Sequence, residues 1–153
     1  MPLSSFHPAI QRWFTERLGE PSPPQREGWP LIRAGQHVLI AAPTGSGKTL
    51  AAFLAAIDTL LTSGAPPDGP GTTAVSQATP TTTVLYVSPL RALANDVQKN
   101  LLGPISEIRA LDPTHPDIRV LVRSGDTPQS ERARMTRTPP HVLVTTPESP
   151  RAS

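Results

Sequence analysis

The stretch HVLIAAPTGSGKTLAAFLAAIDTLL, residues 37–61, decides the fold. Its first part, residues 37–43, is apolar with little polar alternation, which is typical of a strand buried on both faces of a parallel sheet. Residues 49–61 are apolar nearly all round, as expected for a helix that packs on such a sheet. The turn TGSGKT joins the two, so the stretch predicts a strand, a tight glycine turn and a helix.

The turn has the composition of a phosphate-binding P-loop. Its glycines let consecutive backbone N–H groups converge on a phosphate, and the start of the helix adds its dipole. Lys48 would reach the β- and γ-phosphates of a nucleotide, and the Thr49 hydroxyl would bind Mg²⁺. Ala42 replaces the first glycine of the general pattern. A chance glycine turn is the alternative, but its place between strand and helix, and the presence there of one of only two lysines, favour nucleotide binding.

Further apolar segments extend the pattern on both sides. The runs predicted as strands are 83–89, 118–125 and 141–147, and helical spacing is found at 90–111, with a break at Gly103-Pro104, and at 129–137. Before the P-loop, we expect a helix at 8–18 that Gly19 ends, and a short one from Pro23-Pro24 through Ile32. The alternation of strands and helices indicates an α/β fold with a parallel sheet.

Composition excludes several classes of protein. The 20 prolines rule out long uninterrupted helices and coiled coils. Cysteine is absent, which excludes disulfides and thiolate sites, and no pair of the four scattered histidines has metal-ligand spacing. No signal peptide and no apolar stretch of membrane-spanning length is present, so we expect a cytoplasmic protein without a membrane partner.

A serine or threonine followed by a proline stands after each of the later predicted strands. These pairs are Ser88-Pro89, Thr127-Pro128 and Thr146-Pro147. Each pair suits the start of a helix, with the hydroxyl as cap and the proline in the first turn. Helix N-termini at the carboxyl edge of a parallel sheet could hold a nucleic-acid backbone, although the pairs by themselves favour simple capping of helices. Residues 118–139 carry five arginines against two acidic residues, a local charge of +3 that fits either a polyanion partner or a solvated face.

Five segments, in order, resemble the N-terminal half of a superfamily 2 helicase core, and most closely the large helicase-related (Lhr-type) ATP-dependent DNA helicases. The segments are PSPPQREGWP (21–30), APTGSGKT (42–49), VSPLRALAND (87–96), RSGDTPQSERARM (123–135) and HVLVTTPES (141–149). The resemblance implies a RecA-like P-loop lobe that uses ATP and Mg²⁺ and binds nucleic acid. DNA with single-stranded character is the partner it favours, while the sequence leaves DNA and RNA both open.

The resemblance also implies roles for individual residues. Gln25 would read the adenine of ATP, since an amide offers both a donor and an acceptor. Thr44, Gly45, Ser46, Gly47, Lys48 and Thr49 would bind the phosphates and Mg²⁺, with Lys48 and Thr49 serving catalysis. The nucleic-acid contacts would be Pro89, Leu90, Arg91, Ala92, Gly125, Asp126, Thr146 and Pro147, which favours strand contact over simple capping.

Departures from the family pattern lead to a second hypothesis. No Asp-Glu pair, which in this family holds Mg²⁺ and positions the attacking water, occurs in the 153 residues, and they contain no second RecA-like domain. We therefore expect an incomplete lobe: an N-terminal helical, Q-motif-like segment at 1–36, a partial ATP-binding domain at 37–149 with an insertion at 62–82, and a truncated tail at 150–153. Such a chain would act at most as a weak nucleotide- or nucleic-acid-binding module without catalysis. A small kinase is disfavoured, because it leaves the Q-motif-like segment and PLRAL unexplained.

Overall fold

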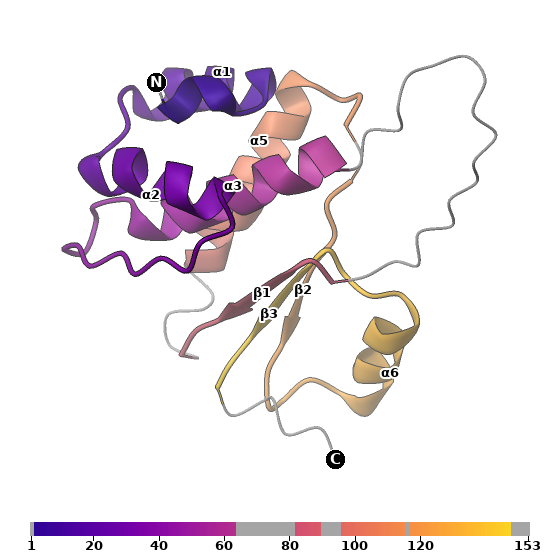
Figure 1. The fold of residues 1–153 in the computed structure, drawn as a ribbon. Coiled ribbons are helices and arrows are strands. Elements are labelled where there is room, and N and C mark those ends of the chain that lie inside the picture. The colour runs from indigo at the N-terminus through magenta and orange to yellow at the C-terminus, as the bar shows by residue number, and fades with distance from the viewer. Residues whose placement is uncertain (1, 64–81, 90–95, 116, 148–153) are drawn as a thin grey trace. The chain divides into compact units, whose positions relative to one another are not determined.

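The computed structural model describes residues 2–63, 82–89, 96–115 and 117–147. The chain divides into two compact units (Figure 1). The helical unit contains residues 1–64 and 96–116, and the sheet unit contains 65–95 and 117–153.

The helical unit is built from the segments around the P-loop. In chain order its elements are the 3₁₀ helix Pro2–Ser5, α1 (Pro8–Leu18), α2 (Pro23–Arg33), α3 (Lys48–Ser63), a π-helical turn (Gln98–Leu102) and α5 (Gly103–Leu111). The predicted helices at 8–18, 49–61 and from Pro23 are therefore confirmed. Gly19 ends α1 with a φ of 78°, a conformation that L side chains rarely adopt.

Aromatic side chains form much of the core of this unit. The rings of Phe6 and Phe14 lie edge-on to Trp29, with centroids 4.9 and 5.5 Å away, and Trp29 is fully buried. The indole N–H of Trp29 donates to the carbonyl oxygen of Ala51 in α3 at 3.0 Å. This hydrogen bond satisfies the polar end of a buried side chain and joins α2 to α3.

A buried carboxylate makes a second connection. Asp58 of α3 is 3% exposed, forms an ion pair with Arg33 at the end of α2, and accepts the backbone N–H of His7 at 2.7 Å. Through these two contacts Asp58 ties the start of α1 and the end of α2 to α3. Loss of Arg33 would leave the buried carboxylate without a compensating charge, which is strongly destabilising.

The expected break at Gly103-Pro104 is present as a π-helical turn. The N–H of Gly103 donates to the carbonyl of Gln98, five residues earlier, and α5 continues from there. Proline has no N–H and its ring clashes with the carbonyl four residues before it, so a widened turn before Pro104 relieves that clash. Residues 90–95, the first part of this predicted helix, lie outside the described residues.

The sheet unit has three parallel strands in the order β1-β3-β2, as Figure 1 shows. They are β1 (Val84–Val87), β2 (Val120–Arg123) and β3 (Val142–Thr145), and α6 (Gln129–Arg137) lies between β2 and β3 in the sequence. Val142 of the central strand pairs with Val84 on one side and Val120 on the other. Burial on both faces, expected for every strand, is found in the central one, whereas Leu85 and Val122 on the edge strands are 61% and 45% exposed.

The predicted strand at 37–43 is wrong. This segment belongs to the helical unit and runs without regular secondary structure beside α2, and Leu39 is 93% exposed. A strand needs a neighbouring strand to satisfy its backbone N–H and C=O groups. Within the described part of the helical unit the elements are helices, so the segment has no ladder to join.

Candidate nucleotide-binding site

The P-loop has the backbone that its sequence predicts. Gly45 and Gly47 have φ values of +84° and +82°, in the left-handed region that side chains disfavour. α3 begins at Lys48, and the N–H of Ala51 donates to the Gly47 carbonyl at 2.9 Å. The loop therefore ends at the N-terminus of a 16-residue helix, where backbone N–H groups and the helix dipole favour an anion.

The only cation of the loop lies against its backbone. The Lys48 ammonium donates to the carbonyl oxygens of Ala42 at 2.8 Å and Pro43 at 3.3 Å. Both carbonyls belong to the residues that lead into the loop, so Lys48 holds the two ends of the loop together. A phosphate bound there would compete with neutral carbonyls for a charged donor, and charge-assisted hydrogen bonds are the stronger ones.

A buried hydroxyl in the loop has hydrogen-bonding capacity to spare. Ser46 Oγ is inaccessible to solvent and has no hydrogen-bond partner within the described residues. Buried polar atoms are normally paired, so an unpaired hydroxyl beside Gly45 and Gly47 fits a loop that holds a polar ligand.

Gln25 connects α2 to the loop. Its side chain is only 4% exposed; Oε1 accepts the N–H of Ser22 at 2.9 Å, and Nε2 donates to the Gly47 carbonyl at 3.3 Å. The Ser22 hydroxyl donates to the Ser46 carbonyl at 2.8 Å. The structure therefore brings together the two segments that the sequence assigns to adenine and to phosphate, although contact of Gln25 with adenine stays a prediction.

Besides its φ, Gly47 has a close neighbour in the Gln25 side chain, which would have to shift to admit a Cβ. A Cβ at this position would lie 2.5 Å from Gln25 Nε2, closer than real Cβ contacts. Gly45 has the same backbone conformation, but a Cβ there would meet nothing within 4 Å. The close approach of α2 to the loop is thus specific to Gly47.

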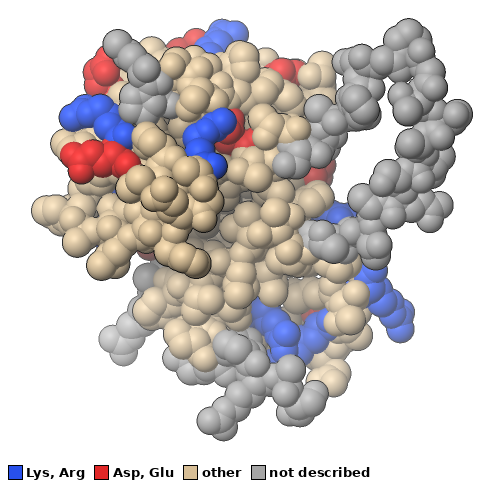
Figure 2. Space-filling model, in the orientation of Figure 1, with Lys and Arg blue, Asp and Glu red and all other residues tan. Residues whose placement is uncertain are grey.

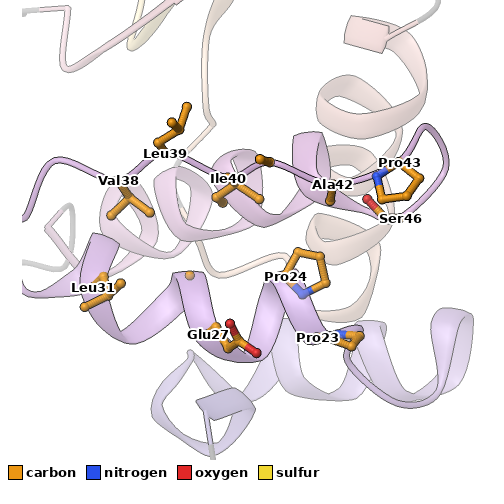
Figure 3. A pocket seen from close by; sticks show the side chains of 12 residues that line it. Pro23, Pro24, Glu27, Leu31, Val38, Leu39, Ile40, Ala42, Pro43 and Ser46 are labelled. Atoms are coloured by element: carbon orange, nitrogen blue, oxygen red, sulfur yellow. The ribbon is translucent and has the colours of Figure 1, made fainter.

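A hollow of about 550 Å³ opens beside the loop, between α2 and residues 38–46 (Figure 3). Apolar side chains from both segments face it, and Glu27 is its one charged lining residue. Pro43 and Ser46 also line it, so the hollow reaches the P-loop itself. Its composition, largely apolar with few polar groups, is typical of small-molecule sites.

In the sheet unit, a turn after β2 carries two of the predicted nucleic-acid contacts, Gly125 and Asp126, both exposed. Arg132 of α6 holds this turn: Nε donates to the Thr127 carbonyl at 2.9 Å, and Nη2 donates to the carbonyls of Gly125 at 3.0 Å and Ser124 at 3.4 Å. Sequence reasoning missed this role, and the only signal was the excess of arginines at 118–139.

The predicted cap at Thr127 is wrong. α6 begins at Gln129 with Pro128 as its N-cap, and the Thr127 hydroxyl instead accepts the N–H of Ser124 at 2.8 Å. The hydroxyl closes the turn because the N–H of Thr127 already donates to the Ser124 carbonyl at 3.2 Å, which brings the two residues together.

The other predicted contacts fall at the ends of β1 and β3. Thr146 is 2% exposed and Pro147 is exposed after β3, while Pro89 is exposed after β1. Leu90, Arg91 and Ala92 lie outside the described residues. Figure 2 shows mainly basic side chains among the charged ones of the sheet unit, whereas the charged side chains of the helical unit are of both signs.

The family model for DEAD/DEAH box helicases matches residues 22–152. The chain belongs to this helicase family. It is 45% identical over 147 residues to "ATP-dependent helicase Lhr-Core" of Sulfolobus acidocaldarius, covering 96% of this chain and 16% of the relative. It is 47% identical over 152 residues to "Lhr helicase/ probable uracil glycosylase" of Mycolicibacterium smegmatis, covering 97% of this chain and 9% of the relative.

A solved helicase structure supports the fold. The structure of Mycobacterium smegmatis helicase Lhr bound to ssDNA and AMP-PNP superimposes with a TM-score of 0.77 at 46% identity, covering 96% of this chain and 18% of that chain. The resemblance to Lhr-type helicases and the expected α/β, RecA-like fold class are therefore confirmed. The chain spans about a sixth or less of the length of these helicases.

The described helices include none that is both long and apolar enough to cross a membrane.

Proposed function

We propose that this chain is the ATP-binding lobe of an ATP-dependent helicase that acts on DNA in the cytoplasm, with ATP held by Gln25 and the P-loop. The observation that carries the proposal is the contact between Gln25 and Gly47, because it joins the predicted adenine reader to the predicted phosphate loop. Membership of the DEAD/DEAH box family supports it, since 45% identity to a helicase extends over nearly the whole chain.

The residues of the loop fit a nucleotide triphosphate. Gly45 and Gly47 expose backbone N–H groups without a Cβ, and the unpaired Ser46 hydroxyl and the Lys48 ammonium add two side-chain donors. Lys48 would exchange its carbonyl partners for the β- and γ-phosphates, and the half-buried Thr49 hydroxyl would hold Mg²⁺. When bound, Mg²⁺ would neutralise charge on the phosphates.

The turn at 124–127 supports the nucleic-acid part of the proposal. Three carbonyls of this turn are held by Arg132, so Gly125 and Asp126 are presented on a fixed backbone rather than a loose loop. A preorganised turn binds a strand backbone at lower entropic cost than one that must first be ordered. A relative of 46% identity carries both ssDNA and AMP-PNP in its structure, which favours DNA with single-stranded character as the partner here.

We further propose that these 153 residues bind nucleotide without hydrolysing it at a measurable rate. Phosphoryl transfer depends on groups positioned around the γ-phosphate, and arginine fingers alone contribute about 10³–10⁵ in rate. The sequence has no Asp-Glu pair to position a water.

The test uses the purified 153-residue chain, Mg²⁺ and a fluorescent ATP analogue. Lys48→Ala should weaken binding at least about tenfold, since it removes a charged donor to two phosphates. Lys99→Ala, the exposed second lysine, is the matched control and should bind as wild type. Equal binding by both variants would refute the nucleotide site, and ATP turnover that Lys48→Ala abolishes would refute the absence of catalysis. Fluorescence anisotropy of a labelled single-stranded oligonucleotide at low salt tests the DNA part separately.

A further inference from the structure

Two histidines and a carboxylate meet in the helical unit. His7 is the N-cap of α1, and Asp112 and His115 lie three residues apart just after α5. One potential ligand atom of each residue lies within 4.8 Å of the other two. Sequence spacing indicates no such pair, because the fold rather than the local chain brings His7 to the turn after α5.

Two potential ligand atoms of this turn lie close together. His115 Nε2 lies 3.1 Å from Asp112 Oδ2 and is inaccessible to solvent, yet it has no hydrogen-bond partner in the described part of the chain. The two atoms lie within ion-pair distance without a hydrogen bond between them, a separation that neighbouring ligands of one metal ion also have. Ligands about 2.0–2.1 Å from a tetrahedral metal ion are roughly 3.3 Å apart.

The carboxylate is held in a ligand-ready orientation. Asp112 Oδ1 accepts both the hydroxyl of Thr114 at 2.5 Å and its N–H at 3.1 Å, which leaves Oδ2 facing His115. Hydrogen bonds of this kind from outside the ligand set orient carboxylate ligands in metal sites.

His7 completes the set at the cost of one weak hydrogen bond. Its ring stands at 89° to the ring of His115, with centroids 4.3 Å apart. Nδ1 accepts the N–H of Ala9 at 3.2 Å, so coordination through Nε2 would put a proton on Nδ1 and break this bond. All three residues are half-buried, which leaves a path for an ion from solvent.

We propose that His7, Asp112 and His115 bind a divalent transition-metal ion of the zinc type, which clips the start of α1 to the turn after α5. Two imidazoles and a carboxylate are a donor set that Zn²⁺ and its neighbours prefer, with water in the remaining position. The site is separate from the Mg²⁺ predicted at Thr49, where the ligands are oxygen atoms.

The test is titration of the metal-free 153-residue chain with Zn²⁺ in isothermal calorimetry, without nucleotide. We expect one equivalent per chain with a Kd below about 10 μM. Asp112→Asn and His115→Gln should each weaken binding at least about tenfold, and Thr114→Val by a smaller factor because it removes only the orienting hydroxyl. His37→Asn changes an exposed histidine outside the cluster and should bind Zn²⁺ as wild type does.

The visible absorption of bound Co²⁺ can be measured on the wild-type chain. It tests the metal site even if a variant fails to fold. A site built from these ligands gives the intense visible absorption of tetrahedral cobalt, which Zn²⁺ then displaces. Absence of a saturable 1:1 complex, a weak octahedral cobalt spectrum, or the same affinity in folded Asp112→Asn and His115→Gln would overturn the proposal.

Discussion

Two heptapeptides of this chain have similar sequences and different structures. HVLIAAP at 37–43 and HVLVTTP at 141–147 share four residues and are apolar at the second to fourth places, while Ala41-Ala42 in the first correspond to Thr145-Thr146 in the second. The second contains β3, the central strand of the sheet, with Val142 and Val144 buried, whereas the first runs beside α2 with no strand partner and leaves Leu39 exposed. The second heptapeptide has neighbouring strands to pair with and, among the described residues, the first has none. Whether a segment forms a strand depends on its neighbours as much as on its own residues.

The largest expected effect is a loss of stability when Val142, at the second place of the second heptapeptide, is replaced, compared with Val38 at the same place in the first. Val142→Asp places an unpaired charge in the buried central strand and should lower the free energy of unfolding by about 4 kcal/mol or more. Val38→Asp makes the same change at the corresponding, half-buried place and should cost about 1 kcal/mol or less. Urea unfolding measures both.

Amide hydrogen exchange gives this comparison an independent check. The N–H of Val142 donates to the Arg119 carbonyl at 3.1 Å and should exchange slowly, whereas the N–H of Val38 should exchange early. Similar losses of stability in the two variants, together with equal protection of the two amides, would show that residues 37–43 are paired as a strand in solution.

The next effect concerns the contacts that hold residues 37–43 in place. If the contacts of the P-loop with Gln25 hold this segment, Gly47→Ala should disturb the segment more than Gly45→Ala, because only at Gly47 would a Cβ meet Gln25. Both variants incur the strain of a positive φ, about 1–2 kcal/mol. Gly47→Ala should in addition weaken ATP-analogue binding at least about tenfold, measured by fluorescence titration. Equal affinities in the two variants would mean that the Gln25 contact does not support the loop.

The smallest effect is a pH dependence of stability that distinguishes His141 from His37. Burial and then the charge of Arg119 lower the pKa of His141, whose Nδ1 accepts the Arg119 N–H at 2.9 Å. The unfolded chain therefore takes up a proton near pH 6.5 before the folded chain does, and stability falls as pH drops through that range. His141→Asn keeps an acceptor but no titration, so its Tm should change less between pH 7.5 and 5.5.

His37→Asn is the control for this measurement. His37 occupies the same place in the first heptapeptide and is exposed, so the same substitution there is the matched comparison for His141→Asn. A pH dependence that survives in His141→Asn would assign it to another group.

Local sequence predicts most elements here and misses what depends on distant partners. Helix starts and stops follow from Gly19, Pro23 and the π-helical turn before Pro104, because backbone restrictions act within a few residues. The glycines of the P-loop are predictable for the same reason. The failed strand at 37–43 and the clamp by Arg132 depend on contacts across the fold, which periodicity does not encode.

The side-chain amide of Gln25 bonds to both Ser22 and Gly47, and this has a thermodynamic consequence. Its oxygen and nitrogen are already engaged by Ser22 and Gly47, so a base that recruits this amide competes with bonds that hold the phosphate loop. Events at the two ends of a nucleotide are then linked, and linkage is reciprocal: whatever loosens the loop frees the amide by the same factor. Discrimination between adenine and other bases would thus be measurable as a change in phosphate affinity, with no movement of the rest of the molecule required.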